Sequence, residues 1–124
     1  MKYVALILLS FCLCSCYNIE RDCSNYKTGS FYSEIVIGDT IYKSNFIRTE
    51  KLQVESFRGS IDSSTVRWIN DCEMIFKTIN PKRMADKKEI HIKILTTTDS
   101  SYTFEYSYVG KSVKQRGVAF KVIN

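Results

Sequence analysis

Apolar and polar side chains alternate in short segments along most of the chain. Ile90, Ile92 and Ile94 share one face of a predicted strand. His91 and Lys93 share the opposite face. This period of two residues is typical of a β-strand that buries one face. The other alternating segments are Val66 and Trp68, Met74 and Phe76, Tyr102 to Tyr108, and Val118 to Val122.

Turn signals separate these segments at intervals of about ten residues. Gly and Pro are sparse, and β-branched and aromatic residues are frequent after Gly29. The pattern contains no amphipathic helix long enough to cover a sheet. We therefore predict an all-β domain, an antiparallel meander of seven to eight strands that curls or closes into a small lipocalin-like barrel. The predicted turns lie at 38–39, 49–51, 58–63, 70–71, 98–101 and 110–114.

A single short helix is predicted at 81–87, within a loop. Asn80 is a favourable N-cap, and Pro81 is favourable at the first helical position. A helix of this length decorates the loop and leaves the sheet to form the core.

The N-terminus carries one unbroken apolar run, Val4 to Phe11, which follows Lys2. A membrane-spanning helix needs about 20 apolar residues, so this run is too short. It is typical of a secretory signal peptide. The sequence therefore predicts export from the cytoplasm.

The four residues 13–16, Leu-Cys-Ser-Cys, resemble a lipobox, in which an aliphatic residue and a small residue precede a lipidated cysteine. Cys16 fits this pattern. Cys12 and Cys14 do not, because a bulky side chain precedes each. The alternative is an ordinary signal peptide cut nearby, which would leave Cys16 as a plain thiol.

Stable anchoring needs more than one acyl chain, and a lipidated N-terminal cysteine carries several. Lipidation of Cys16 would therefore tether the protein permanently. Tyr17 stands where an Asp would signal retention in the inner membrane, so the cell envelope, and within it the outer membrane, is the expected location. We expect a signal peptide at 1–15, a lipidated N-terminus and tether at 16–25, and a β-domain at 26–124. Which leaflet carries the anchor is open.

Two cysteines, Cys23 and Cys72, follow the lipobox. In an oxidising envelope compartment an isolated pair favours one disulfide. It would close a loop of about 50 residues, which contributes about 4 kcal/mol in the chain-entropy model. Two free thiols or a metal site are the alternatives, although other metal ligands are not close by in the sequence.

Charge and motifs argue against several functions. The formal net charge of +5 is spread along the chain, and the basic clusters at 82–88 and 111–116 lack interleaved aromatic residues. Nucleic acid is therefore not an expected partner. The only histidine, His91, lies on a polar strand face without a nucleophile motif beside it. We predict no catalytic residue, no metal, no cofactor and no enzymatic activity.

Three short motifs together resemble a group of small single-domain lipoproteins of Bacteroidetes. They are Lys-Thr-Gly-x-Phe at 27–31, Arg-x4-Gln-x-Glu at 48–55 and Val-x-Trp-x2-Asp-Cys at 66–72. The resemblance implies an all-β envelope lipoprotein and supplies no catalytic residue. It also implies that Cys23 pairs with Cys72, that Gly29 begins the first strand, and that Trp68 belongs to the core.

Arg48, Gln53 and Glu55 form a candidate polar cluster around one hairpin turn. Pointing inward, they would be the convergent polar groups of a ligand pocket. Pointing outward, they would form a solvent-exposed ladder that contributes little to stability. Alternation does not choose between the faces, and we favour the outward orientation.

Aromatic residues offer a second candidate surface. Tyr102 and Tyr106 belong to a stripe that could line a pocket, and Trp68 could serve as a ligand platform. We favour the buried face of a strand for the stripe and a core position for Trp68. Asp39-Thr40-Ile41 resembles the acceptor of Bacteroidetes O-glycosylation, so Thr40 is a weak modification candidate.

The sequence thus favours a membrane-anchored envelope lipoprotein that acts as a non-enzymatic binding or scaffolding module. The alternative is a lipocalin-like carrier of a small lipid or sugar. The expected partners are the membrane, through the lipid, and either an envelope protein or a small apolar ligand. We expect a monomer.

Overall fold

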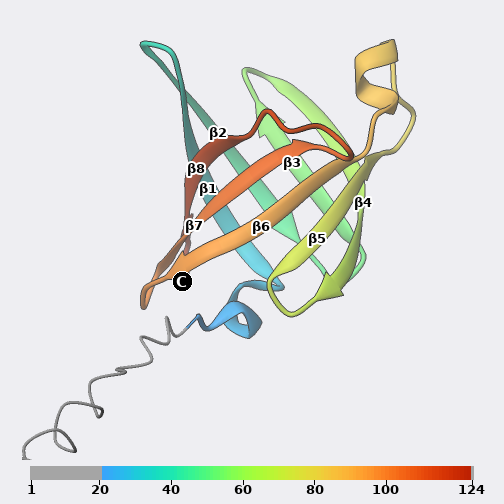
Figure 1. The fold of residues 1–124 in the computed structure, drawn as a ribbon. Coiled ribbons are helices and arrows are strands. Elements are labelled where there is room, and N and C mark those ends of the chain that lie inside the picture. Colours follow the sequence, from blue (N-terminus) through green and yellow to red (C-terminus); the bar gives the residue numbers. More distant parts are fainter. Residues whose placement is uncertain (1–20, 124) are drawn as a thin grey trace, which may run out of the picture.

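Eight antiparallel strands form a closed barrel in the computed structural model, which describes residues 21–123 (Figure 1). Each strand pairs with the next in sequence, and β8 returns to pair with β1. This confirms the predicted all-β meander. The predicted signal peptide and Cys16 lie outside the described residues. The strands are β1 (Gly29–Ile37), β2 (Thr40–Arg48), β3 (Leu52–Phe57), β4 (Ser60–Asn70), β5 (Glu73–Thr78), β6 (Ile90–Thr97), β7 (Ser101–Tyr108) and β8 (Gln115–Lys121).

Closure removes the free sheet edges that an open meander would expose. The seam between β1 and β8 runs from the pair Phe31 and Lys121 to the pair Ile35 and Gly117. Alternate residues of each strand fill the interior. The buried hydrophobic side chains are Cys23, Tyr26, Phe31, Phe46, Val66, Met74, Phe76, Ile94, Tyr102, Phe104 and Ala119.

In β8 the small residues face the interior and the large apolar residues face outward, which is the opposite of the usual arrangement. Ala119 is fully buried, whereas Phe120 lies outside and stacks on the exposed ring of Tyr32 at 4.8 Å. A Cβ atom on Gly117 would lie 2.7 Å from Cζ of Phe104. The interior next to β8 is therefore occupied by large rings from β7, and only small residues fit there. The apolar face 118–122 packs on the outside.

Two connections differ from the sequence prediction. The turn expected at 58–63 contains only Arg58 and Gly59, whose φ angles of 48° and 80° suit a tight two-residue hairpin. The helix expected at 81–87 is a 3-10 turn, η2 (Met84–Lys87). Asn80 adopts a positive φ of 54° and does not cap it. Asn80 therefore belongs to the loop before η2 and is not the N-cap of a helix.

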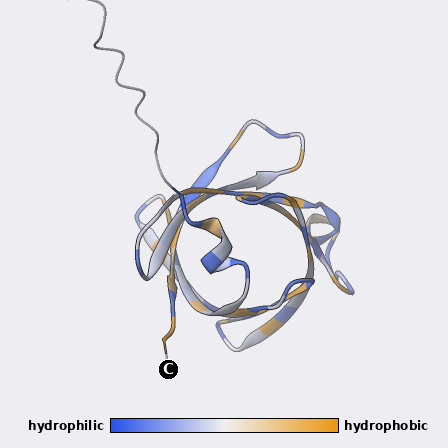
Figure 2. Cartoon of the chain, turned by 90° about the horizontal axis from the view of Figure 1, so that it is seen from below, coloured by the Kyte–Doolittle hydropathy of each residue, from blue (hydrophilic) through white to orange (hydrophobic). Residues whose placement is uncertain are grey.

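A second 3-10 turn, η1 (Cys23–Tyr26), lies across one end of the barrel (Figure 2). Residues 23–25 belong to the predicted tether, yet Cys23 is 2% exposed, and the neighbouring Tyr26 is 1% exposed. The disulfide between Cys23 and Cys72 is confirmed, and it fixes η1 to the β4–β5 turn. The folded domain therefore begins before residue 26.

Hydrogen bonds attach the segment around η1 to the rest of the same rim. Arg21 donates to the carbonyl of Ile94 at 2.9 Å, and the Tyr26 hydroxyl donates to the carbonyl of Thr98. On the other side, Lys121 donates to the carbonyl of Asn25 at 2.7 Å. Contacts with β6, the β6–β7 turn and β8 make η1 a plug.

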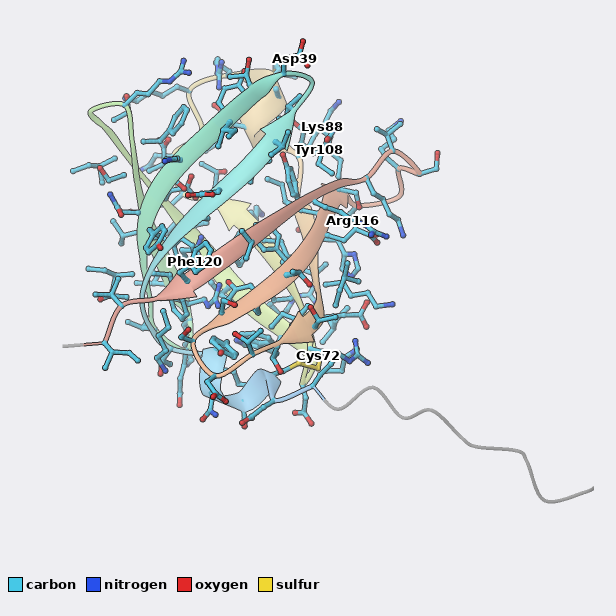
Figure 3. The ribbon with its side chains drawn as sticks, turned by 90° about the vertical axis from the view of Figure 1, so that its left-hand side faces the viewer. Asp39, Cys72, Lys88, Tyr108, Arg116 and Phe120 are labelled. Atoms are coloured by element: carbon cyan, nitrogen blue, oxygen red, sulfur yellow. A yellow bond between two sulfur atoms is a disulfide. The ribbon has the colours of Figure 1, made fainter. Side chains whose placement is uncertain are left out.

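The opposite end of the barrel carries the β1–β2 turn with Asp39, far from the disulfide at Cys72 (Figure 3). The β3–β4 turn and the β5–β6 loop with η2 lie at that same end. Within residues 21–123 no helix has the length and apolarity to cross a bilayer.

Candidate ligand-binding site

An interior cavity of about 200 Å³ lies between the plug and the open end. Most of its accessible lining is apolar, with polar groups concentrated on one side. Ligand sites in proteins commonly have this combination of an apolar body and a few convergent polar groups. The lining residues are Ser33, Ile35, Phe46, Arg48, Gln53, Glu55, Phe76, Ile90, Ile92, Tyr102, Phe104 and Tyr106.

A vestibule, also of about 200 Å³, adjoins this cavity at the mouth of the barrel. Gln53, Glu55, Phe76 and Ile90 line both spaces. The vestibule is more polar and also contains residues from β4, the end of β5 and the β5–β6 loop: Asp62, Ser64, Thr78, Asn80, Lys82, Arg83 and Asp86. The inner cavity is therefore reached from solvent at the end opposite the plug.

Arg48 forms the floor of the cavity. It is 2% exposed and donates to the Gln53 side-chain oxygen at 3.0 Å and to the Tyr102 hydroxyl at 3.1 Å. It also donates to the backbone carbonyls of Tyr26 and Lys27 in the plug. The guanidinium therefore connects the plug to the barrel wall through neutral acceptors.

Aromatic rings surround the same guanidinium. Its carbon lies 5.0 Å from the ring centre of Phe31 and 5.4 Å from that of Phe46. The rings of Tyr102 and Trp68 follow at 5.7 and 5.8 Å. Cation–π attraction is strongest where water is excluded, so these rings partly replace the hydration that Arg48 loses.

The outward orientation favoured for the Arg48, Gln53 and Glu55 cluster is wrong. All three side chains line the interior, while Leu52 and Val54 are 42% and 40% exposed. Charged side chains usually face solvent, but here the surrounding rings and the hydrogen bonds to the plug make the interior favourable for the Arg48 guanidinium. Two apolar β3 side chains face solvent as a result.

Glu55 stands at the neck between the inner cavity and the vestibule. Burial raises the pKa of its carboxyl above the ordinary value, and the charge of Asp62 raises it further. Hydrogen bonds from Ser44 and Gln53 act in the opposite direction. Among residues 21–123, no basic side chain lies within ion-pair distance of Glu55.

The aromatic stripe of β7 points inward over most of its length. Tyr102 and Phe104 are buried, Tyr106 is half-buried in the cavity wall, and Tyr108 is 41% exposed at the rim. Burial raises the pKa of the Tyr106 hydroxyl, and the charges of Tyr108 and Glu55 add to this effect. Both candidate tyrosines, Tyr102 and Tyr106, thus line the cavity.

Trp68 packs against the core near the plug and does not line the cavity. Its ring lies below the ammonium of Lys27, 5.2 Å from Nζ. This position agrees with the core role expected for Trp68. Trp68 could act as a ligand platform only if it faced the cavity, and it is not among the lining residues.

His91 lies away from the cavity. Its Nε2 is 3.0 Å from Oε1 of Glu73, with which it forms a partly buried pair across β5 and β6. Hydrogen bonds from Asn70 and His91 hold the pKa of the Glu73 carboxyl below its ordinary value. In the described part of the chain, no three His, Cys, Asp or Glu side chains are grouped as metal ligands.

Two small polar residues were not singled out from the sequence: Ser33 in the cavity lining and Ser44 beside it on the paired strand. Ser33 is 4% exposed, and its hydroxyl is 2.8 Å from that of Ser44 on the paired strand. Small polar residues at the inward positions of otherwise apolar strands are the signal that could have identified them. They extend the polar side of the cavity from β3 to β1.

Comparison with known protein families found no family model that matches the chain, and comparison with curated proteins found no match either.

Proposed function

We propose that this protein is a lipid-anchored envelope protein that binds a small, mostly apolar ligand inside its barrel. The observation that carries the proposal is a closed barrel that is plugged at one end and has an apolar cavity reachable from the other. A scaffold alone needs no such cavity, because a barrel of this size can fill its interior with side chains.

The anchor fits this arrangement. The chain enters the domain at the plug, where Arg21 and Asp22 bond to β6. With Cys16 lipidated, the plugged end would face the membrane and the mouth would face away from it. A ligand would then exchange with the aqueous side or with a partner, and not directly with the bilayer.

Native mass spectrometry of protein extracted from its own membranes tests the ligand. We expect a bound small molecule that is absent after Ile92→Phe, which fills the cavity. Ile61→Phe is the matched control, because Ile61 is 71% exposed. An unliganded wild-type protein that instead cross-links to one envelope protein would contradict the carrier function.

Scaffolding remains the second candidate, supported by the exposed apolar side chains of β2 and β3. Ile47, Leu52 and Val54 are 58%, 42% and 40% exposed on the outer face. The cross-linking arm of the same experiment distinguishes the two functions. For the anchor, Cys16→Ser should leave the precursor unprocessed and the protein out of the membrane fraction, whereas unchanged partitioning would exclude lipidation.

A further inference from the structure

The cavity has one polar wall and one apolar wall. Ser33, Arg48, Gln53 and Glu55 line the polar wall from the neighbouring strands β1 to β3, together with the apolar Ile35 and Phe46. The opposite side is formed mainly by Phe and Ile side chains of β5 to β7. A ligand that fits both walls has a hydrocarbon part and one polar group.

The two charged groups of the polar wall differ in how far the protein satisfies them. Arg48 uses four N–H donors on protein acceptors, and its amide partner Gln53 is occupied as well. Of the described residues, only Ser44 and Gln53 act as hydrogen-bond donors toward Glu55. A carboxylate has about four acceptor positions, so Glu55 retains capacity for a donor that enters the cavity.

Charges around the neck also favour a cation. The vestibule contains the carboxylates of Glu55, Asp62 and Asp86, against the two cations Lys82 and Arg83. Arg83 is already paired with Asp86 at 3.3 Å. Lys43 lines a further small pocket that Glu55 also lines, and it is paired with Glu34 at 3.7 Å. Within residues 21–123 no ion pair joins Glu55 to a basic side chain, although Lys82 lines the same vestibule.

Aromatic residues line the cavity together with the same carboxylate. Phe46 is the cross-strand partner of Glu55, and Tyr106 lines the same cavity from β7. Aromatic rings beside a carboxylate are the usual surroundings of a bound ammonium group.

We propose that the ligand is a small alkyl- or arylalkylamine, whose ammonium binds Glu55 and whose hydrocarbon part fills the inner cavity. The ammonium supplies the missing counter-ion at the neck. The apolar wall takes the hydrocarbon part, and Arg48 stays a structural group. This inference rests on the proposed carrier function and assigns the chemical class of its ligand.

Titration calorimetry with hexylammonium, hexanol and hexanoate near neutral pH tests the assignment on the purified protein. The three probes share a hydrocarbon chain and differ only in the head group. We expect hexylammonium to bind about tenfold or more tightly than hexanol, as one partly buried charge pair allows, and hexanoate to bind most weakly. Glu55→Gln should abolish the preference for hexylammonium over hexanol.

Glu105→Gln is the matched control. Glu105 lies on β7 and pairs with Lys114 and Arg116 outside the cavity, so this variant should keep the amine preference. Hexanol binding with no amine preference, tightest binding of hexanoate, or a preference that survives Glu55→Gln would overturn the amine assignment while leaving the carrier function intact. Binding of none of the three probes would overturn both.

Discussion

Replacing Arg48 with Ala is the substitution for which the structure predicts the largest loss of stability. The guanidinium is 2% exposed and makes four hydrogen bonds, two of them to the backbone of the plug. Its removal leaves the carbonyls of Tyr26 and Lys27 and the amide of Gln53 without their donor. A buried acceptor that loses its donor costs about 1–3 kcal/mol, so with several acceptors left unsatisfied we expect a loss of about 4 kcal/mol in the free energy of unfolding.

A loss of that size is a large share of the about 5–15 kcal/mol that stabilises a typical domain. Arg48→Lys should cost about 2 kcal/mol, because an ammonium keeps the charge but cannot reach both the plug and Gln53. Arg67→Ala is the control. Arg67 is exposed on β4, so its loss should change stability by no more than about 0.5 kcal/mol.

Urea unfolding followed by fluorescence measures these differences. Trp68 is the only tryptophan and packs beside Arg48, so it reports directly on this end of the barrel. The m-value should stay constant while the midpoint shifts. If Arg48→Ala lowered stability no more than Arg67→Ala does, Arg48 would not connect the plug to the barrel and the argument would fail.

Three further outcomes follow from the structure. Replacing Cys23 and Cys72 together with Ser should cost about 4 kcal/mol, measured by urea unfolding without reductant, because the closed loop spans 49 residues. Gly117→Ala should lower thermal stability by about 1–3 kcal/mol, because the new methyl would lie 2.7 Å from the Phe104 ring. Glu55→Gln should stabilise the empty barrel near neutral pH, and the gain should shrink as the pH falls towards the ordinary carboxyl pKa of about 4.5 and be absent below it.

The sign of the last effect follows from linkage. Burial raises the pKa of folded Glu55, so the unfolded chain releases this proton first as the pH rises. The ionised carboxylate then costs stability, and an amide does not. A gain from Glu55→Gln that is equal at low and neutral pH would contradict the raised pKa. If Gly117→Ala had no effect on stability, the Phe104 ring would have to move aside. If the reduced and oxidised proteins were equally stable, the disulfide would not stabilise the domain.

Strand alternation was sufficient to predict the barrel, because most segments bury the larger apolar face. β8 is the exception. Its larger residues, Val118 and Phe120, face outward, since the rings of β7 leave room only for Gly117 and Ala119. The space available at one strand depends on side chains of its neighbours, and this information is not local in sequence.

The position of Arg48 could not be predicted for a similar reason. A charged residue beside a hairpin turn is usually exposed. Here η1 and Lys27 after it supply two carbonyls and the barrel supplies four rings, and all of these except Phe46 come from segments distant in the sequence. The same plug explains why residues 23–25 belong to the domain. The disulfide was predictable because the cysteine count left one pair, yet its role as a fixing point for η1 required the fold.

The central claim is that this barrel, closed at the plug, takes a small ligand through its opposite end into the interior. Methyl NMR of isotope-labelled isoleucines during addition of hexylammonium tests it most directly. The account predicts saturable shifts at Ile92 and Ile90, which line the cavity, and none at Ile61, which is exposed. Shifts at Ile61 and other surface methyls, with Ile92 unchanged, would contradict it.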